Sequence, residues 1–168
     1  FNGSDQRLNY PNTIVTGTEA FTVWGWAIST ASDFDNYPAP FGNFMNHDGW
    51  NGIWELLLFP SGTEYIQLRV NGDYYRINSG DVVVSFNETH MYALTCNPAN
   101  STVALYLDGV QVASGDYSGS GTLDTVNANS EFNIGADGNT GSDGYAQFWM
   151  GQIWGVGIVS GTAMTESE

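Results

Sequence analysis

The sequence contains no lysine, three arginines and a single cysteine in 168 residues. Because phosphate-binding surfaces need clustered Lys and Arg, this shortage argues against nucleic acid as a partner. Anionic membranes are disfavoured for the same reason. No apolar run reaches the length of a transmembrane helix, so we expect no membrane insertion. Cys96 has no partner for an internal disulfide, and its place at the end of an apolar strand pattern predicts a buried core thiol.

Acidic residues are in excess, with 18 Asp and Glu and a formal net charge of -15. This charge has three interpretations: solubility in a salty extracellular medium, binding of divalent cations, or docking on a basic partner. Most of the Asp residues fall in predicted loops, and this placement adds weight to cation binding. The composition therefore points to an extracellular setting, a cell surface or a virion surface.

The turn-forming residues divide the chain into short strand patterns. With 21 Gly and 14 % aromatic residues, the composition is typical of an all-β protein. About ten strand-length patterns recur at intervals of roughly 8–12 residues, which predicts two packed antiparallel sheets. No linker or repeat interrupts residues 1–168, so we expect one domain. The chain opens at Phe1 without an initiator methionine, and we expect the domain to be part of, or excised from, a larger chain.

Two sequence turns predict tight hairpins. Asp108-Gly109 lies between the alternating segments 102–107 and 110–114, and both turn positions must accept a positive φ. Asn71-Gly72 predicts a second hairpin between segments 64–70 and 73–77, and Ser79-Gly80 predicts a turn into a further strand over 82–86. A polar turn at 98–101 joins the strand pattern 89–96 to that of 102–107.

Four segments together resemble a known family. Residues 89–95 and 105–109 resemble the pattern W-H-H-V-A-V-T … L-Y-V-D-G of laminin-G-like, concanavalin A-like domains. Residues 21–26 resemble its F-T-(I/V)-x-x-W strand, and residues 148–156 resemble its ending F-x-G-x-I-x-x-V-x-I, with one extra residue before Gly151. The resemblance implies a jelly-roll β-sandwich. Residues 163–168 resemble A-L-(S/T)-x-x-E, which implies a short C-terminal helical turn capped by Thr165.

Segment 21–28 has apolar members on both faces. Strand alternation places Phe21, Val23, Gly25 and Ala27 on one face, and Thr22, Trp24, Trp26 and Ile28 on the other. Because both sets contain large apolar side chains, we predict a strand that is covered on both sides.

A catalytic site finds little support. Glycanases of the laminarinase type carry Glu-x-Asp-x-x-Glu on one strand, and this chain has no such motif. Glu55 is the one acidic residue inside a strongly apolar strand pattern. His90 aligns with the start of the family's W-H-H strand, where a structural role is the default. We therefore assign no catalytic residue, although a carboxylate pair formed across strands would still allow a hydrolase or a lyase.

Two loops have the chemistry of a calcium site. Ca²⁺ prefers oxygen ligands, and these loops place several carboxylate and amide oxygens close together beside Gly. The alternative is ordinary turn chemistry, since Asp, Asn and Gly fill loops in any case. The candidate ligands are Asp137, Asn139 and Asp143 in the first loop, and Asp33 and Asp35 in the second.

Aromatic residues are dense in segment 29–52, which we predict to be a long polar loop at the rim of the sandwich. Exposed aromatic residues tend to mark interfaces, so these side chains are candidates for contact with a glycan or a surface protein. The alternative is that the rings fold back as lids over the ends of the sandwich. The candidates are Tyr37, Phe41, Phe44, His47 and Trp50, with Tyr74, Tyr75 and Tyr145 from other turns.

The sequence leaves three functional classes open. In the first, the chain is a non-catalytic extracellular module for carbohydrate binding or adhesion that recognises a glycan through its rim loops. In the second, it is a structural assembly protein of a virion or cell surface, such as a decoration, fibre or capsid-surface domain, that forms homo-oligomers. A glycoside hydrolase or polysaccharide lyase of the same fold is the third option. One fold hosts many functions, so the resemblance does not choose among them.

Overall fold

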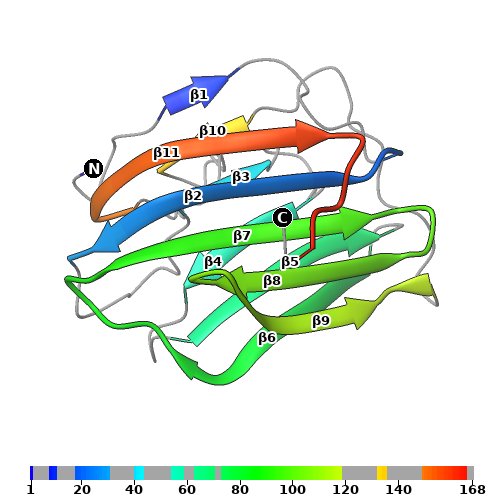
Figure 1. Cartoon of the computed structure of the whole chain (residues 1–168), viewed down its shortest axis with the longest axis horizontal. Coiled ribbons are helices and arrows are strands. Elements are labelled where there is room, and N and C mark those ends of the chain that lie inside the picture. Colours follow the sequence, from blue (N-terminus) through cyan, green and yellow to red (C-terminus); the bar gives the residue numbers. More distant parts are fainter. Residues whose placement is uncertain are drawn as a thin grey trace.

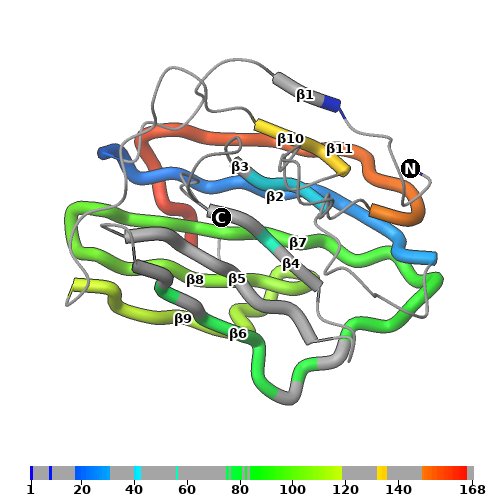
Figure 2. The backbone as a smooth tube through the Cα atoms, turned by 180° about the vertical axis from the view of Figure 1, so that it is seen from behind, coloured from blue at the N-terminus to red at the C-terminus, as the bar shows by residue number. Residues whose placement is uncertain are grey.

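The computed structural model describes residues 1, 8–10, 18–30, 40–43, 54–58, 63–70, 73–118, 132–135 and 149–165. Within these ranges the chain forms β-strands that pair antiparallel in two sheets, as Figure 1 shows. Seen from behind, strands of the six-stranded sheet lie over those of the five-stranded sheet (Figure 2). The two-layer antiparallel sandwich predicted from the sequence is confirmed. The described ranges contain no helix with the length and apolar character needed to cross a membrane.

The strand order places neighbours in sequence beside one another in two runs, β3 to β6 and β7 to β9. The five-stranded sheet has the order β11-β2-β7-β8-β9, with β2 Phe21–Ser29, β7 Thr89–Asn97, β8 Thr102–Leu107, β9 Val110–Asp116 and β11 Gly151–Ser160. The six-stranded sheet has the order β1-β10-β3-β4-β5-β6, with β1 Leu8–Tyr10, β3 Phe41–Asn43, β4 Trp54–Leu58, β5 Thr63–Val70, β6 Asp73–Val83 and β10 Phe132–Ile134.

The core lies between the two sheets and follows from strand alternation. Phe21, Val23 and Ala27 of β2 have no exposed surface, and neither have the alternate residues Tyr92, Leu94 and Cys96 of β7. Phe41 and Leu56 meet this layer from the opposite sheet and are equally buried. Burial of such side chains stabilises the fold by about 1.5–3 kcal/mol each.

The hairpin predicted at Asp108-Gly109 is present. Asp108 and Gly109 have φ of 52° and 82°, as a two-residue turn of this kind requires. The Asp108 carboxylate accepts a 2.8 Å hydrogen bond from the backbone N–H of Met91, and its second oxygen lies 2.8 Å from Nδ1 of His90. The turn is thereby fastened to the start of β7, which gives His90 the structural role expected of it.

The predicted turn at Ser79-Gly80 is wrong. Strand β6 runs without a break from Asp73 to Val83, with its pairing to β5 shifted between Thr63 and Tyr65. Gly80 has a φ of 63°, and its N–H donates to the Asn78 side chain at 3.0 Å. The extra residues therefore form an irregularity inside one strand, because local hydrogen bonds satisfy the backbone there without ending the strand.

Residues 41–43 correct the prediction of an uninterrupted loop over 29–52. They form β3, which pairs with β10 and β4. Phe41 points into the core with no exposed surface, so its role is packing and not ligand contact. A strand of three residues is too short to show alternation, and its partners come from distant parts of the sequence.

The end of the described chain crosses the five-stranded sheet. After β11, residues 161–165 pass over the outer face of β2 and β7 (Figure 1). We call this segment the C-terminal strap. Residues 162–165 form no regular element, and the rest of the predicted helical turn, residues 166–168, lies outside the described part.

Candidate ligand-binding face

The outer face of the five-stranded sheet carries large aromatic side chains. The alternation that buries Val23 and Ala27 directs Trp24 and Trp26 to the opposite face. Trp26 is 39 % exposed and pairs in register with Trp154 of β11, which is 42 % exposed. On its other side Trp26 pairs with Met91 of β7. The large apolar side chains of Trp154, Trp26 and Met91 therefore lie side by side on the outer face.

A second row forms a trough between two aromatic rings. Trp24 of β2 pairs with Ala93 of β7, which pairs with Tyr106 of β8. Because neighbouring strands are about 4.8 Å apart, the two aromatic residues stand on strands about 10 Å apart with only the Ala93 methyl group between them. The Tyr106 hydroxyl donates to Oε1 of Gln111 at 3.3 Å. The trough thus has aromatic sides, a small apolar floor and a polar end.

Glycines of β11 leave room for the two indoles. A Cβ atom at Gly157, the register partner of Trp24, would clash with atom Cζ2 of that ring. A Cβ at Gly155 would lie 2.8 Å from Cε3 of Trp26. Both rings therefore rest against bare backbone. This contact restricts each ring on one side, and such restriction reduces the entropy lost when a side chain is ordered at an interface.

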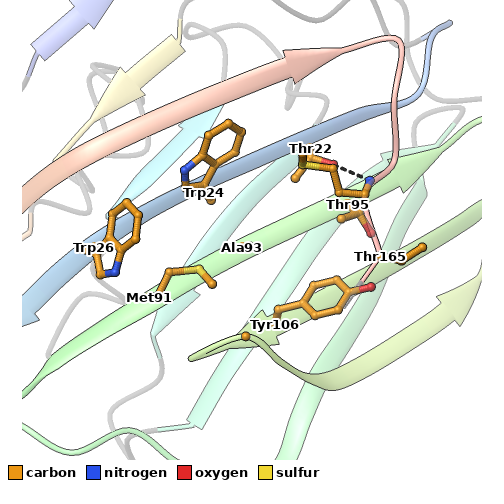
Figure 3. Close-up of a pocket in the computed structure, with 10 residues that line it drawn as sticks. Thr22, Trp24, Trp26, Met91, Ala93, Thr95, Tyr106 and Thr165 are labelled. Atoms are coloured by element: carbon orange, nitrogen blue, oxygen red, sulfur yellow. Dashed lines mark hydrogen bonds between the residues drawn. The ribbon is translucent and has the colours of Figure 1, made fainter. Parts of the chain in front are cut away.

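The outer face of β2, β7 and β8 contains a hollow of about 320 Å³ (Figure 3). We call it the aromatic hollow, and its volume and mostly apolar walls with a few polar groups are typical of small-molecule sites. It is lined by Thr22, Trp24, Trp26, Met91, Ala93, Thr95, Tyr106, Gly109, Met164 and Thr165.

Thr22 holds the C-terminal strap at one side of the hollow. Its hydroxyl donates to the carbonyl of Thr162 at 3.1 Å and accepts from the N–H of Met164 at 2.8 Å, the bond drawn in Figure 3. Gly161 adds a backbone bond to Ala20 at 2.6 Å. The strap places Met164 and Thr165 in the wall of the hollow.

A second, more polar hollow of about 540 Å³ lies beside the first. The two share Thr95, Tyr106, Met164 and Thr165. Asp116 is the one carboxylate among its described lining residues, and a hydrogen bond from the backbone N–H of Ser118 lowers the pKa of Asp116. We call this second cavity the polar hollow. Its further lining residues are Asn97, Thr102, Val103, Ala104, Gln111, Ser114, Gly115 and Ala163.

The single thiol lies inside the sandwich, away from both hollows. Cys96 has no exposed surface, and its Sγ is 3.7 Å from the hydroxyl oxygen of Tyr117. Burial raises the pKa of Cys96 to about 12, although the contact with Tyr117 opposes this. Burial also raises the pKa of Tyr117. The predicted core thiol is confirmed, because a protonated buried thiol is a poor nucleophile.

Of the side chains predicted to bind a ligand, the structure describes those of Phe41 and Tyr75, and both pack between the sheets. Tyr75 is half-buried and packs between the sheets, where its ring centroid is 6.0 Å from that of Tyr117. Tyr74 lies in β6. The other aromatic and histidine candidates lie outside the described residues and stay predictions: Tyr37, Phe44, His47, Trp50 and Tyr145.

The predicted calcium ligands also lie outside the described part: Asp33, Asp35, Asp137, Asn139 and Asp143. Among the residues that are described, no group of three His, Cys, Asp or Glu side chains is placed to hold a metal ion. Calcium binding therefore stays a prediction.

Sequence reasoning missed the aromatic face although its signal was present. Alternation placed Trp24 and Trp26 on one side of segment 21–28, but that side was predicted to be covered by a second layer. Instead, Trp26 is exposed, and within the described part of the chain the strap crosses this side. Two tryptophans at alternate positions, opposite a strand with glycines at 155 and 157, would have pointed to exposed rings.

Comparison with known proteins agrees with this architecture. The family described as the concanavalin A-like lectin/glucanases superfamily matches residues 2–168. Comparison with curated proteins finds no match. A heptameric SAP-like pentraxin from Limulus polyphemus has a TM-score of 0.67 at 16 % identity, covering 99 % of this chain and 76 % of that one.

Two further solved structures are similar in fold. The CBM40 of Ruminococcus gnavus IT-sialidase has a TM-score of 0.70 at 14 % identity, covering 89 % of this chain and 80 % of that one, and it has also been solved bound to α2,3-sialyllactose. Domain 4 of AbnA, a GH43 extracellular arabinanase from Geobacillus stearothermophilus in complex with arabinotriose, has a TM-score of 0.70 at 18 % identity, covering 99 % and 71 %.

Proposed function

Because this chain belongs to the concanavalin A-like lectin/glucanases superfamily, we propose that it is a non-catalytic carbohydrate-binding module of an extracellular, cell-surface or virion-surface protein. The observation that carries the proposal is the aromatic hollow, in which Trp24, Trp26 and Tyr106 surround a floor of small side chains. Sugar rings have apolar C–H faces that pack against aromatic rings, and their hydroxyls need neutral polar partners. The solved structures with sialyllactose and arabinotriose add support by fold.

The hollow offers both kinds of contact. Trp24 and Tyr106 flank Ala93, so a sugar ring over the alanine would meet an aromatic side chain on either side. Hydroxyl and amide groups of Thr95 and Gln111 lie along the polar side of the same surface. The aromatic groups supply affinity and the neutral polar groups supply orientation.

Binding without cleavage suits the charges on this face. Glycosidases act with two carboxyl groups about 5–9.5 Å apart. Among the described residues that line the two hollows, Asp116 is the one carboxylate. A pair on this face would therefore need a second acid from outside these described lining residues.

Matched tryptophan variants test where a glycan binds. We expect Trp26→Ala to weaken binding to responsive members of a glycan array by about tenfold or more, because a buried aromatic contact contributes over 1.4 kcal/mol. Trp50→Ala makes the same change in the predicted rim loop and serves as the control. If Trp26→Ala binds normally and Trp50→Ala loses binding, the glycan site lies in the predicted rim loop. Absence of binding across the array by the parent protein would contradict the proposal.

Assembly with other protein copies is the second candidate. The exposed apolar side chains of Trp26, Trp154 and Met150 favour it, since aromatic and methionine residues are enriched at protein interfaces. Light scattering after size exclusion distinguishes the two functions. A defined homo-oligomer that dissociates in Trp154→Arg, in a protein without glycan affinity, would favour assembly.

A further inference from the structure

We infer that the aromatic hollow selects uncharged glycans and discriminates against sugars that carry a carboxylate or sulfate. This inference rests on the proposed carbohydrate binding and names the class of ligand. It depends on the distribution of charge around the hollow.

The strands of the five-stranded sheet contain no lysine or arginine. The chain has no lysine, and its arginines are Arg7, Arg69 and Arg76. Arg69 lies in β5 and Arg76 in β6, both in the opposite sheet, and Arg7 is outside the described residues. Arg is the residue that recognises carboxylates with two parallel hydrogen bonds, and the strands below the hollow supply none.

The one imidazole in these strands is already engaged. His90 pairs in register with Ala27, whose side chain faces the core, so His90 shares the inner face. Its Nδ1 is 2.8 Å from the Asp108 carboxylate, and its ring meets Tyr92 edge-on. It therefore offers no charge to a ligand on the outer face.

Carboxylates lie at the margin of the same surface. Asp108 precedes Gly109, which lines the aromatic hollow, and Asp116 lines the polar hollow. Glu19 lies beside the strap, where its carboxylate accepts a 3.0 Å bond from Ser160. An anionic sugar would lose water on entering the hollow, would find no Lys or Arg among its described lining residues and would be repelled by the nearby carboxylates. A neutral sugar has only hydroxyls to satisfy.

Matched glycan pairs test the selection directly. The probes are neutral and sialylated versions of the same oligosaccharides on an array, together with polygalacturonate and its methyl ester. At about 0.01 M NaCl we expect the neutral member of each responsive pair to bind at least about tenfold more tightly. At about 1 M NaCl the gap should narrow, because the screening length falls from about 30 Å to about 3 Å.

A matched pair of variants locates the effect. Met91→Arg puts a guanidinium into the hollow, whereas Met150→Arg makes the same change at an exposed site that does not line it. We expect Met91→Arg to shift the preference toward the acidic member by about tenfold and Met150→Arg to leave it unchanged. An equal shift in both variants would show that overall charge, and not the hollow, sets the preference, and would overturn the inference.

The two proposals fail in different ways. Equal or tighter binding of the acidic members at low salt, lost in Trp26→Ala, would overturn the selection of uncharged glycans and leave the binding module intact. If no member of any pair binds, the proposed function itself is overturned, and the selection with it.

Discussion

Each outward tryptophan of β2 packs against a glycine of β11, and a larger residue there would collide with the indole ring. Trp24 rests against Gly157 and Trp26 against Gly155, so the indoles occupy space that a Cβ atom would fill. An aromatic ring over a strand glycine also restores packing that the glycine gives up. At the scale of single residues, the shape of the hollow is therefore encoded partly in β11.

The substitution Gly157→Ala tests this dependence. The added methyl group must displace the Trp24 ring, so we expect glycan binding to weaken and the free energy of unfolding to fall by about 1–3 kcal/mol. Urea unfolding and array binding measure the two effects. The control is the same change in a Trp24→Ala background, where the clash is gone. A loss of equal size in both backgrounds would contradict the role of Gly157 as a seat for the indole.

Cys96 predicts how stability depends on pH. Its pKa is raised from 9.0 to about 12 in the folded chain, so the folded state keeps the thiol proton to higher pH than the unfolded state does. The stabilisation is fully present below about pH 9 and is lost as pH rises toward 12. The slope contributed by one proton is about 1.4 kcal/mol per pH unit.

Urea unfolding between about pH 8 and pH 11 measures this slope. We expect Cys96→Ala to unfold more easily at neutral pH but to lose stability less steeply above pH 9. Tyr117→Phe is a useful comparison, because the raised pKa of Tyr117 makes a contribution of the same sign that begins at higher pH. Identical alkaline slopes in the parent protein and Cys96→Ala would show that the thiol does not ionise on unfolding in this range.

At the scale of elements, hairpins and alternating strands could be predicted from the sequence. Asp108-Gly109 was recognisable because few residues accept positive φ in succession. Strand β2 was recognisable from its alternation, and its inner face matches the predicted set Phe21, Val23 and Ala27. Its outer face was interpreted wrongly, because local pattern shows that a face is apolar but not what covers it.

Other elements depend on partners that are distant in the sequence. Strand β3 exists because β4 and β10 provide hydrogen bonds on both sides, and nothing within residues 41–43 indicates this. The irregularity near Gly80 depends on pairing with β5. The aromatic hollow combines side chains of β2, β7 and β8 with the strap, so its formation required the sheet order.

The strap has no regular secondary structure, and Thr22 makes two hydrogen bonds to it. Thr22→Val preserves the shape of the side chain but removes both hydrogen bonds, to Thr162 and Met164. We expect a loss of about 1–3 kcal/mol in stability and faster hydrogen exchange at the Met164 amide. Thr95→Val, the same change at the register partner on β7, is the control. Equal exchange at Met164 in both variants would contradict the attachment.

At the scale of the whole molecule, charge is distributed unevenly over a conventional sandwich. The net charge of -15 disfavours the compact state through self-repulsion, and it also keeps copies of the chain apart. Two of the three arginines lie in the six-stranded sheet, so the other sheet presents a neutral aromatic surface with an acidic margin. Cations should therefore stabilise the molecule, either by screening or by occupying a specific site.

Thermal unfolding can separate these two effects. If the predicted loops bind Ca²⁺, about 1 mM CaCl₂ should raise the Tm more than MgCl₂ at the same concentration or NaCl at the same ionic strength, and a chelator should reverse the gain. Mg²⁺ is the critical comparison, because it has the same charge but demands a tighter geometry and releases its water reluctantly. If screening alone acts, Ca²⁺ and Mg²⁺ should raise the Tm by the same amount.

Variants then assign the calcium effect to a loop. We expect the double change Asp137→Asn with Asp143→Asn to abolish the additional Ca²⁺ stabilisation, because two carboxylates are lost while the size of the side chains is kept. Asp33→Asn with Asp35→Asn makes the same change of charge in the second candidate loop. Equal Tm values in Ca²⁺ and Mg²⁺ for the parent protein would contradict a specific site, and the acidic composition would then act through solubility. A loss confined to the second variant would transfer the site to residues 33–35.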